Sequence, residues 1–154
     1  MEVSIGSMFS GIGGLELGIE RGLRRAGLSP SVRWQVEQDS YCRSVLRKHW
    51  PEATRYDDVT ALPLKSIGRV DLLCGGFPCQ DLSIAGNGAG IEGDRSGLWR
   101  SMYRVACALA PSIVIMENVP PILISGAGVI FGKMASIGYD LWWDCIPAAA
   151  IGAP

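Results

Sequence analysis

The sequence predicts an α/β fold with a doubly wound, mostly parallel sheet. Short apolar runs typical of buried strands alternate with amphipathic segments of helical period. A glycine turn, SGIGG at residues 10–14, joins the first run to the first helix. The 154 residues are enough for one domain and too few for two. We therefore expect one domain over residues 1–154, with helices on both faces of the sheet.

The first half of the chain contains three predicted strands and two predicted helices. Residues 3–9 and 31–37 read as strands, and residues 55–59 as a weaker one. The first helix follows the glycine turn and ends at Gly27, with its apolar residues four apart. The second helix begins at a cap on Asp39 or Ser40 and ends at Pro51. One face of this second helix is expected to be buried, and it carries Tyr41, Val45, Leu46 and His49.

The second half continues the alternation. Residues 70–74 and 113–116 are short apolar runs of the kind buried in a parallel sheet. A helix is predicted between them at 96–110, because Trp99, Met102, Tyr103 and Ala106 follow helical spacing. Another helix is expected at 126–137, and a last strand at 140–146.

Charge and cysteine content limit the classes of function. Fourteen basic and 15 acidic residues give a net charge of −1, which is mild evidence against stand-alone DNA binding. The five cysteines lack metal-ligand spacing, so we expect reduced thiols, no disulfide and no metal. No apolar run reaches the ~18 residues of a membrane span, and Glu2 and Glu16 argue against a signal peptide. We therefore expect a soluble, cytoplasmic protein without a membrane partner.

The glycine turn lies where a doubly wound fold holds a nucleotide. It differs from the dinucleotide fingerprint, because the sixth position counted from Gly11 is Glu16, and an acidic residue at a helix start repels a pyrophosphate. A nucleoside without phosphates fits better. Glu37, at the end of the second predicted strand, can accept hydrogen bonds from ribose hydroxyls. The alternative is a structural turn beside a solvated glutamate.

Polar residues also follow the other predicted strands. One of Asp57 and Asp58 can accept from an exocyclic amine such as adenine N6, although such a pair often marks only a turn. Cys79, whose backbone is fixed by the preceding Pro78, is a candidate nucleophile or a small buried hydrophobe. Glu117, with an amide beside it at position 118, is a candidate acid or a polar strand end.

These candidates converge on one edge, because the carboxyl ends of parallel strands lie together. A nucleophile, an acid and a nucleoside pocket predict a transferase site. The only histidine, His49, lies on the helix face expected to be buried, so we interpret it as structural and do not favour a cysteine–histidine protease site. Residues 75–98 contain seven glycines without periodicity, which is typical of a functional loop or lid.

The segments FSGIGG, GGFPCQDLS and MENV, in this order and spacing, resemble motifs of the DNA (cytosine-5) methyltransferases that use S-adenosylmethionine. The match covers nearly the whole chain. It implies a Rossmann-like methyltransferase fold, double-stranded DNA as substrate and a role in restriction–modification. By position, Cys79 resembles the nucleophile and Glu117 the residue that binds and protonates the cytosine ring. The cofactor-binding residues implied in the same way are Phe9, Gly11, Ile12, Gly14, Glu37 for the ribose, Asp58 and Val59 for the adenine, Pro78 and Leu98.

The resemblance stops short at the C-terminus. Family members continue past the strand expected at 140–146 with a Gln-x-Arg-x-Arg motif, a target-recognition region and a segment that returns to complete the cofactor pocket, whereas this sequence ends at Pro154. The family's last, antiparallel strand pairs beside the strand expected at 113–116. We therefore expect an incomplete sheet and the N-terminal part of an enzyme, with DNA contacts supplied by the missing region or by a complementing second chain.

Two classes of function remain open at this point. The first is an enzyme, active in its full-length form or alongside a second chain. The second is a non-catalytic remnant or S-adenosylmethionine-binding module that methylates nothing. A tRNA cytosine methyltransferase is a third alternative, disfavoured because the loop reads PCQ, the form typical of the DNA enzymes.

Overall fold

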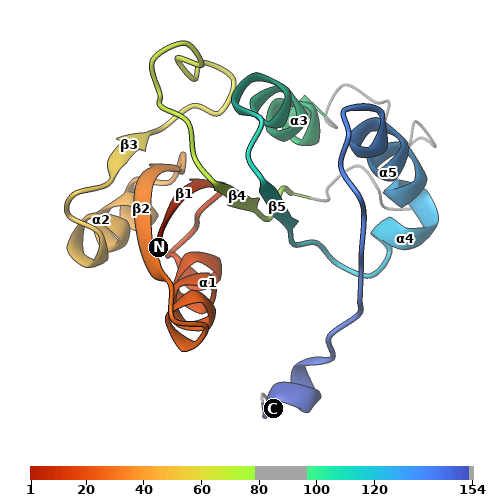
Figure 1. The fold of residues 1–154 in the computed structure, drawn as a ribbon, viewed down its shortest axis with the longest axis horizontal. Helices are drawn as coiled ribbons and strands as arrows, with labels where there is room; N and C mark the ends of the chain where they lie inside the picture. The colour runs from red at the N-terminus through yellow and green to blue at the C-terminus, as the bar shows by residue number, and fades with distance from the viewer. Residues whose placement is uncertain (79–96, 153–154) are drawn as a thin grey trace.

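A five-stranded parallel sheet forms the centre of the molecule (Figure 1). The computed structural model describes residues 1–78 and 97–152. The strands lie in the order β3-β2-β1-β4-β5, and every neighbouring pair is parallel. Their bounds are β1 Glu2–Met8, β2 Ser29–Val36, β3 Thr54–Tyr56, β4 Leu72–Gly75 and β5 Ile113–Met116. The predicted α/β class and the first five strands are confirmed.

Helices connect the strands and follow the last one. They are α1 Gly14–Arg25, α2 Ser40–His49, α3 Gly97–Leu109, α4 Ile122–Ser125, α5 Ala127–Ser136 and the 3₁₀ turn η3 Ala148–Ile151. Gly27 ends α1 in the left-handed conformation, with φ of 77°, and its N–H donates to the carbonyl of Arg24 in the last turn of the helix. Asp39 caps α2, since its carboxylate accepts from the N–H of Cys42 at 2.8 Å.

The core has two halves, one on each face of the sheet. Along β1, Ile5 points to the face covered by α1, whereas Met8 belongs to the cluster that includes α3 and α5. Strand β4 repeats the alternation, with Leu72 on the α1 side and Leu73 on the other. All four residues of β4 are buried because strands pair with it on both sides.

The buried face expected of α2 is narrower than predicted. Leu46 is fully buried, but Tyr41 is 72% exposed and His49 is also exposed. Periodicity predicts an apolar stripe along a helix, but of the four residues on this stripe only Leu46, which lies against Gly13 of the glycine turn, is fully buried. The interpretation of His49 as a buried structural residue is therefore wrong.

The strand expected at 140–146 is absent from the structure. These residues are extended but unpaired and exposed, and they lead to η3 (Figure 1). The apolar residues of LWWDCI favour a strand, yet a strand needs a neighbour to satisfy its backbone groups. The neighbouring strand β5 is itself only half-buried, with Ile113 51% exposed, although the sequence predicted a buried strand.

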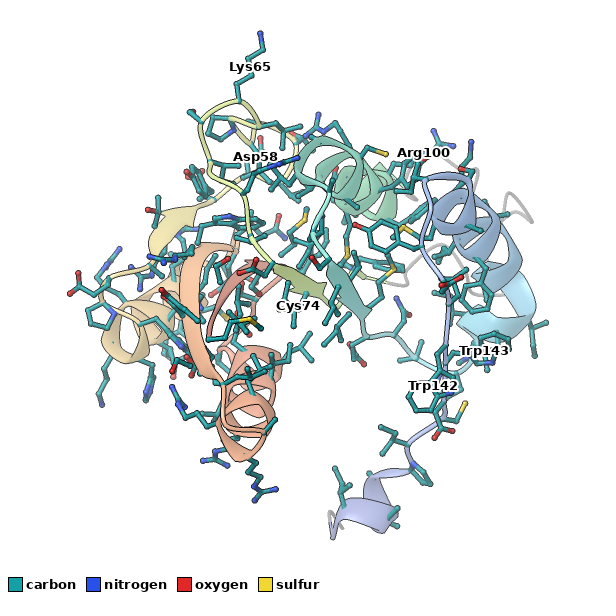
Figure 2. All side chains as sticks on the ribbon, viewed as in Figure 1. Asp58, Lys65, Cys74, Arg100, Trp142 and Trp143 are labelled. Carbon is teal, nitrogen blue, oxygen red and sulfur yellow. The ribbon has the colours of Figure 1, made fainter. Side chains whose placement is uncertain are left out.

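The tryptophans follow the same division. Trp34 on β2 and Trp99 on α3 are 1% and 4% exposed. In the C-terminal segment, Trp142 is 94% and Trp143 58% exposed, and Figure 2 shows both far from the sheet centre marked by Cys74. The final segment thus carries large apolar side chains that the described residues leave uncovered.

Candidate active site

Because all five strands are parallel, the residues that follow them gather at one edge of the sheet. Phe9 follows β1, Glu37 follows β2, Asp57 follows β3 and Glu117 follows β5. Gly76 follows β4 and leads to Pro78, the last described residue before the gap. The strand ends that carry the glycine turn, Glu37 and Glu117 therefore lie at one edge, as predicted, whereas Cys79 lies outside the described residues.

The glycine turn between β1 and α1 has an unusual backbone. Phe9 and Gly11 have φ of 57° and 53°, and Gly13 has φ of 90°. A side chain at Gly13 would also meet the ring of Trp50, whose nearest atom lies 2.3 Å from the position of a Cβ. Glycine is thus required at position 13 by both conformation and space.

Glu37 connects this turn to the end of β2. Its Oε2 accepts from the N–H of Gly11 at 2.7 Å, and its Oε1 accepts from the N–H of Asp39 at 2.9 Å. Its own N–H donates to the carbonyl of Tyr56 on β3 at 3.0 Å. The carboxylate is half-buried and held in place, and each of its oxygens keeps a further lone pair for a ligand hydroxyl.

A cavity of about 510 Å³ opens at this edge. Six of the nine predicted cofactor residues line it, namely Phe9, Glu37, Asp58, Val59, Pro78 and Leu98. Gly11 is joined to the cavity wall through Glu37, whereas Ile12 and Gly14 are not among the lining residues, and Ile12 is 60% exposed. The cavity combines an aromatic ring and aliphatic surface with carboxylates, as a nucleoside requires.

The cavity also contains residues that the sequence argument did not single out. They are Val36, Gln38, Thr60 and Gly76, together with Asp57, which had been considered only as a pair with its neighbour. Most of them adjoin a predicted residue in the chain. The available signal was position, since any residue just after a parallel strand can reach this edge.

Asp58 is exposed at the mouth of the cavity (Figure 2). Its Oδ1 accepts from the hydroxyl of Thr60 at 2.6 Å and from the N–H of Thr60 at 2.7 Å. These bonds lower the pKa of the carboxyl below its ordinary value. The second oxygen is available to accept from a ligand amine.

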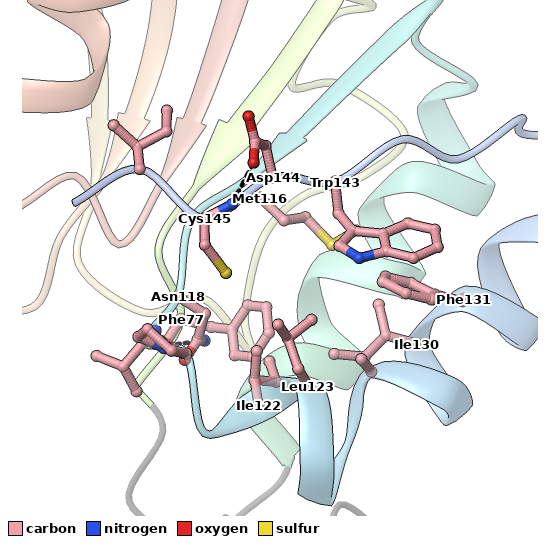
Figure 3. A pocket seen from close by; sticks show the side chains of 14 residues that line it. Phe77, Met116, Asn118, Ile122, Leu123, Ile130, Phe131, Trp143, Asp144 and Cys145 are labelled. Atoms are coloured by element: carbon pink, nitrogen blue, oxygen red, sulfur yellow. Dashed lines mark hydrogen bonds between the residues drawn. The ribbon is translucent and has the colours of Figure 1, made fainter. Parts of the chain in front are cut away.

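Glu117 and Asn118 fix the loop that follows β4. The N–H of Glu117 donates to the carbonyl of Gly75 at 3.0 Å, and the amide of Asn118 donates to the carbonyl of Phe77 at 2.9 Å (Figure 3). A Cβ at Gly76 would lie 2.5 Å from Oε2 of Glu117. The exposed Glu117 carboxylate therefore lies against the segment that leads to position 79.

The predicted nucleophile, Cys79, and the rest of the glycine-rich loop to residue 96 lie outside the described residues. Cys74 on β4 is a contrast. It is fully buried, and burial together with the nearby Glu16 raises the pKa of its thiol to about 12. Cys74 is therefore a neutral core residue rather than a reactive thiol.

Glu16 lies in the first turn of α1, as the sequence predicts, and its side chain is completely buried against the sheet. Its Oε1 accepts from the amide of Gln35 on β2 at 3.3 Å. The expectation that an acid at this helix start disfavours a pyrophosphate stays a prediction.

A second, smaller cavity of about 200 Å³ lies beside the end of β5 (Figure 3). Met116, Asn118 and residues of α4 and α5 line one side, and Trp143, Asp144, Cys145 and Ile146 line the other. A further groove of about 500 Å³ separates β5 from residues 139–144. The C-terminal segment thus runs near β5 without pairing with it.

Comparison with known proteins decides the family. The family model for C-5 cytosine-specific DNA methylases matches residues 3–154. The chain belongs to this family. Type II methyltransferase M2.BsuMI of Bacillus subtilis is 34% identical over 96% of this chain and 38% of its own length. Type II methyltransferase M.HhaI of Haemophilus parahaemolyticus is 33% identical over 96% of the chain and 44% of its own length.

A solved structure agrees with the sequence relatives. It is an Escherichia coli prophage-encoded protein described as a DNA modification methyltransferase, with a TM-score of 0.65 and 28% identity over 87% of this chain and 38% of that one. The chain spans about two-fifths of the length of these relatives. The fold class and the family resemblance are confirmed.

No group of three His, Cys, Asp or Glu side chains in residues 1–78 and 97–152 is arranged to hold a metal ion. None of the helices in those same ranges combines the length and hydropathy needed to cross a bilayer.

Proposed function

We propose that this chain is the cofactor-binding and catalytic part of an enzyme that transfers a methyl group from S-adenosylmethionine to C5 of cytosine in double-stranded DNA. The observation that carries the proposal is the cavity of about 510 Å³ at the carboxyl edge of the sheet, which six of the residues predicted to bind the cofactor line. The carboxylate of Glu117 lies beside Gly76, another residue of its lining. Membership of the C-5 cytosine methylase family gives the cavity this chemistry.

The residues of the cavity suit the cofactor. The carboxylate of Glu37 would accept from the ribose hydroxyls, and the ring of Phe9 offers an apolar surface for the adenine. The second oxygen of Asp58 would accept from the adenine amine. When bound, S-adenosylmethionine supplies an electrophilic methyl group.

Cytosine needs activation because C5 of the ring is a weak nucleophile. We assign to Cys79 the addition of its thiolate to C6, which forms a C–S bond and moves ring electrons toward C5. Glu117, as a carboxylic acid, would hold a proton at N3 and stabilise this adduct. Once C5 carries the methyl group, loss of the C5 proton and departure of the thiolate restore the aromatic ring. A duplex base must first be extruded to reach such a site.

The DNA-reading parts are proposed to come from outside these 154 residues. The relatives are more than twice as long as the matched region, and the net charge of −1 gives the chain no strong field toward phosphate. A longer form of the protein or a complementing C-terminal half would supply them. The half-exposed β5 favours this over a self-sufficient enzyme, and it leaves an S-adenosylmethionine-binding half as the second candidate.

The test is transfer of labelled methyl to DNA by the assembled enzyme, with Cys79→Ser as the variant. We expect the variant to lose methyl transfer and adduct formation with 5-fluorocytosine DNA, while cofactor binding stays nearly intact. Cys107→Ser is the matched control, because Cys107 is exposed on α3 and remote from the cavity lining. A covalent 5-fluorocytosine adduct on the Cys79→Ser variant would exclude Cys79 as the nucleophile.

A further inference from the structure

Arg43 lies behind the ribose carboxylate, in the first helical turn of α2. Its Nη1 donates to the carbonyl of Glu37 at 2.9 Å and to the carbonyl of Gln38 at 2.6 Å. The side chain is half-buried, and it is not among the residues that line the 510 Å³ cavity. Arg43 therefore touches the backbone that presents Glu37 rather than the space that a ligand would occupy.

The position of this cation needs an explanation. A positive charge near a helix N-terminus opposes the helix dipole, and basic residues favour the last turn, where α2 has Arg47, Lys48 and His49. Arg43 makes no ion pair with a carboxylate anywhere in the described ranges. Besides its attraction to the capping carboxylate of Asp39, its two hydrogen bonds to successive carbonyls hold it there, since helical side chains lean toward the N-terminus.

Those carbonyls belong to the turn that aims the carboxylate. Glu37 and Gln38 leave β2 and enter the cap of α2, where the backbone has no ladder partner on the Arg43 side. One guanidinium nitrogen donates to both carbonyls, while the Glu37 carboxylate accepts from the N–H groups of Gly11 and Asp39. Arg43, Glu37 and the glycine turn are therefore consecutive members of one hydrogen-bond chain.

We propose that Arg43 is a positioning residue that fixes the Glu37 carboxylate, and through it the glycine turn, in the geometry that binds the cofactor ribose. This rests on the proposed function of the cavity. Because both bonds come from one nitrogen, a lysine ammonium can replace them, whereas an aliphatic side chain without N–H donors cannot.

The experiment compares Arg43→Met, Arg43→Lys and Arg47→Ala with the unaltered chain. Methionine keeps the aliphatic stem and removes the donors, and Arg47 is exposed one turn further along the same helix. The first readout needs no ligand. It is the amide proton shift and exchange rate of Gly11 in NMR spectra, because this N–H donates to a carboxylate only while Glu37 is held. The second readout is calorimetric affinity for S-adenosylmethionine.

For Arg43→Met we expect an upfield Gly11 amide with faster exchange and roughly tenfold weaker cofactor binding. Arg43→Lys restores most of both, and Arg47→Ala changes neither. An unchanged Gly11 amide in Arg43→Met overturns the proposal, as does a shifted amide with unchanged affinity. If the unaltered chain does not bind the cofactor, the proposed function of the cavity fails, while the Gly11 amide still decides whether Arg43 positions Glu37. Arg43→Leu, which also lacks N–H donors, gives the same readouts should the methionine variant not fold.

Discussion

Strands β4 and β5 are paired and both are short apolar runs, yet they differ in burial. LLCG of β4 is buried at all four positions, whereas IVIM of β5 has no fully buried residue. Strand β4 pairs with β1 and β5, while β5 pairs only with β4 within the described part of the chain. An apolar run therefore becomes a core strand only when both of its edges and both of its faces are covered.

Two longer regions of the chain, residues 1–78 and residues 141–151, differ in burial in the same way. Residues 1–78 hold the cavity, a carboxylate with both oxygens bonded, and glycines packed against rings. Residues 141–151 are exposed throughout. We expect substitutions in the first region to be costly and equivalent ones in the second to be tolerated, which the following experiments examine.

The largest effect is expected at Gly6 on β1. An alanine Cβ there would lie 2.2 Å from the ring of Trp34, which is buried, so Gly6→Ala should lower the free energy of unfolding by about 3 kcal/mol. The matched control is Gly132→Ala in α5, where the added methyl meets open space. This change should raise the free energy of unfolding by about 0.5–1 kcal/mol. Urea unfolding measures both. Equal effects at the two glycines would show that packing against Trp34 is not what makes the substitution at Gly6 costly.

Glu37→Ala tests the proposed cofactor cavity in residues 1–78. The change removes a charged acceptor and frees the N–H groups of Gly11 and Asp39, so affinity for S-adenosylmethionine should fall by roughly 1.5–3 kcal/mol. Binding by these 154 residues is expected to be weak, because they span only about two-fifths of the length of the relatives. The control is Glu52→Ala, an exposed acid outside the cavity lining. Equal affinity of Glu37→Ala and the unaltered chain in calorimetry would contradict the ribose role.

Cys74 should make the free energy of unfolding depend on pH in the alkaline range. Its thiol keeps its proton to a pKa of about 12 in the folded chain, against 9.0 for an ordinary thiol. The unfolded state therefore loses this proton first, so stability is full below pH 9 and falls as pH rises toward 12. At pH 10 the loss should be about 1.4 kcal/mol. Unfolding curves of Cys74→Ala should lack this slope, and those of Cys107→Ala, an exposed cysteine, should keep it.

The smallest change in folding stability, but a visible change in association, is expected at the β5 edge. The strand offers unpaired backbone groups and carries no charge before Glu117, so the chain should dimerise or aggregate through it. Ile113→Lys puts a charge on a half-exposed position and should reduce light scattering with a stability change within about 0.5 kcal/mol. A C-terminal half with the Arg-x-Arg motif should act likewise. A stable monomer of the unaltered chain at high concentration would show that the edge is already covered.

The sequence predicted what depends on local pattern and on strand ends. The strands around Ile5 and Leu73, the Asp39 cap and the meeting of Glu37 with Asp58 follow from periodicity and from parallel topology. It could not predict how much of a helix face is covered by the rest of the chain, and so it placed the exposed His49 on a buried face. It also could not predict the loss of the strand at 140–146, because the alternation of apolar residues does not reveal whether a partner strand is present.

The placement of the tryptophans equips the chain with built-in optical probes. Trp34 and Trp99, buried in the core, should emit at short wavelength and be shielded from iodide, whereas the exposed Trp142 and Trp143 should emit at long wavelength and be quenched. The fifth tryptophan, Trp50, is half-buried and should lie between the two groups. If a further strand bound in the groove between β5 and residues 139–144, it would cover Trp142 and Trp143 and shift their emission to short wavelength. Completion of the sheet can therefore be followed in real time without a label.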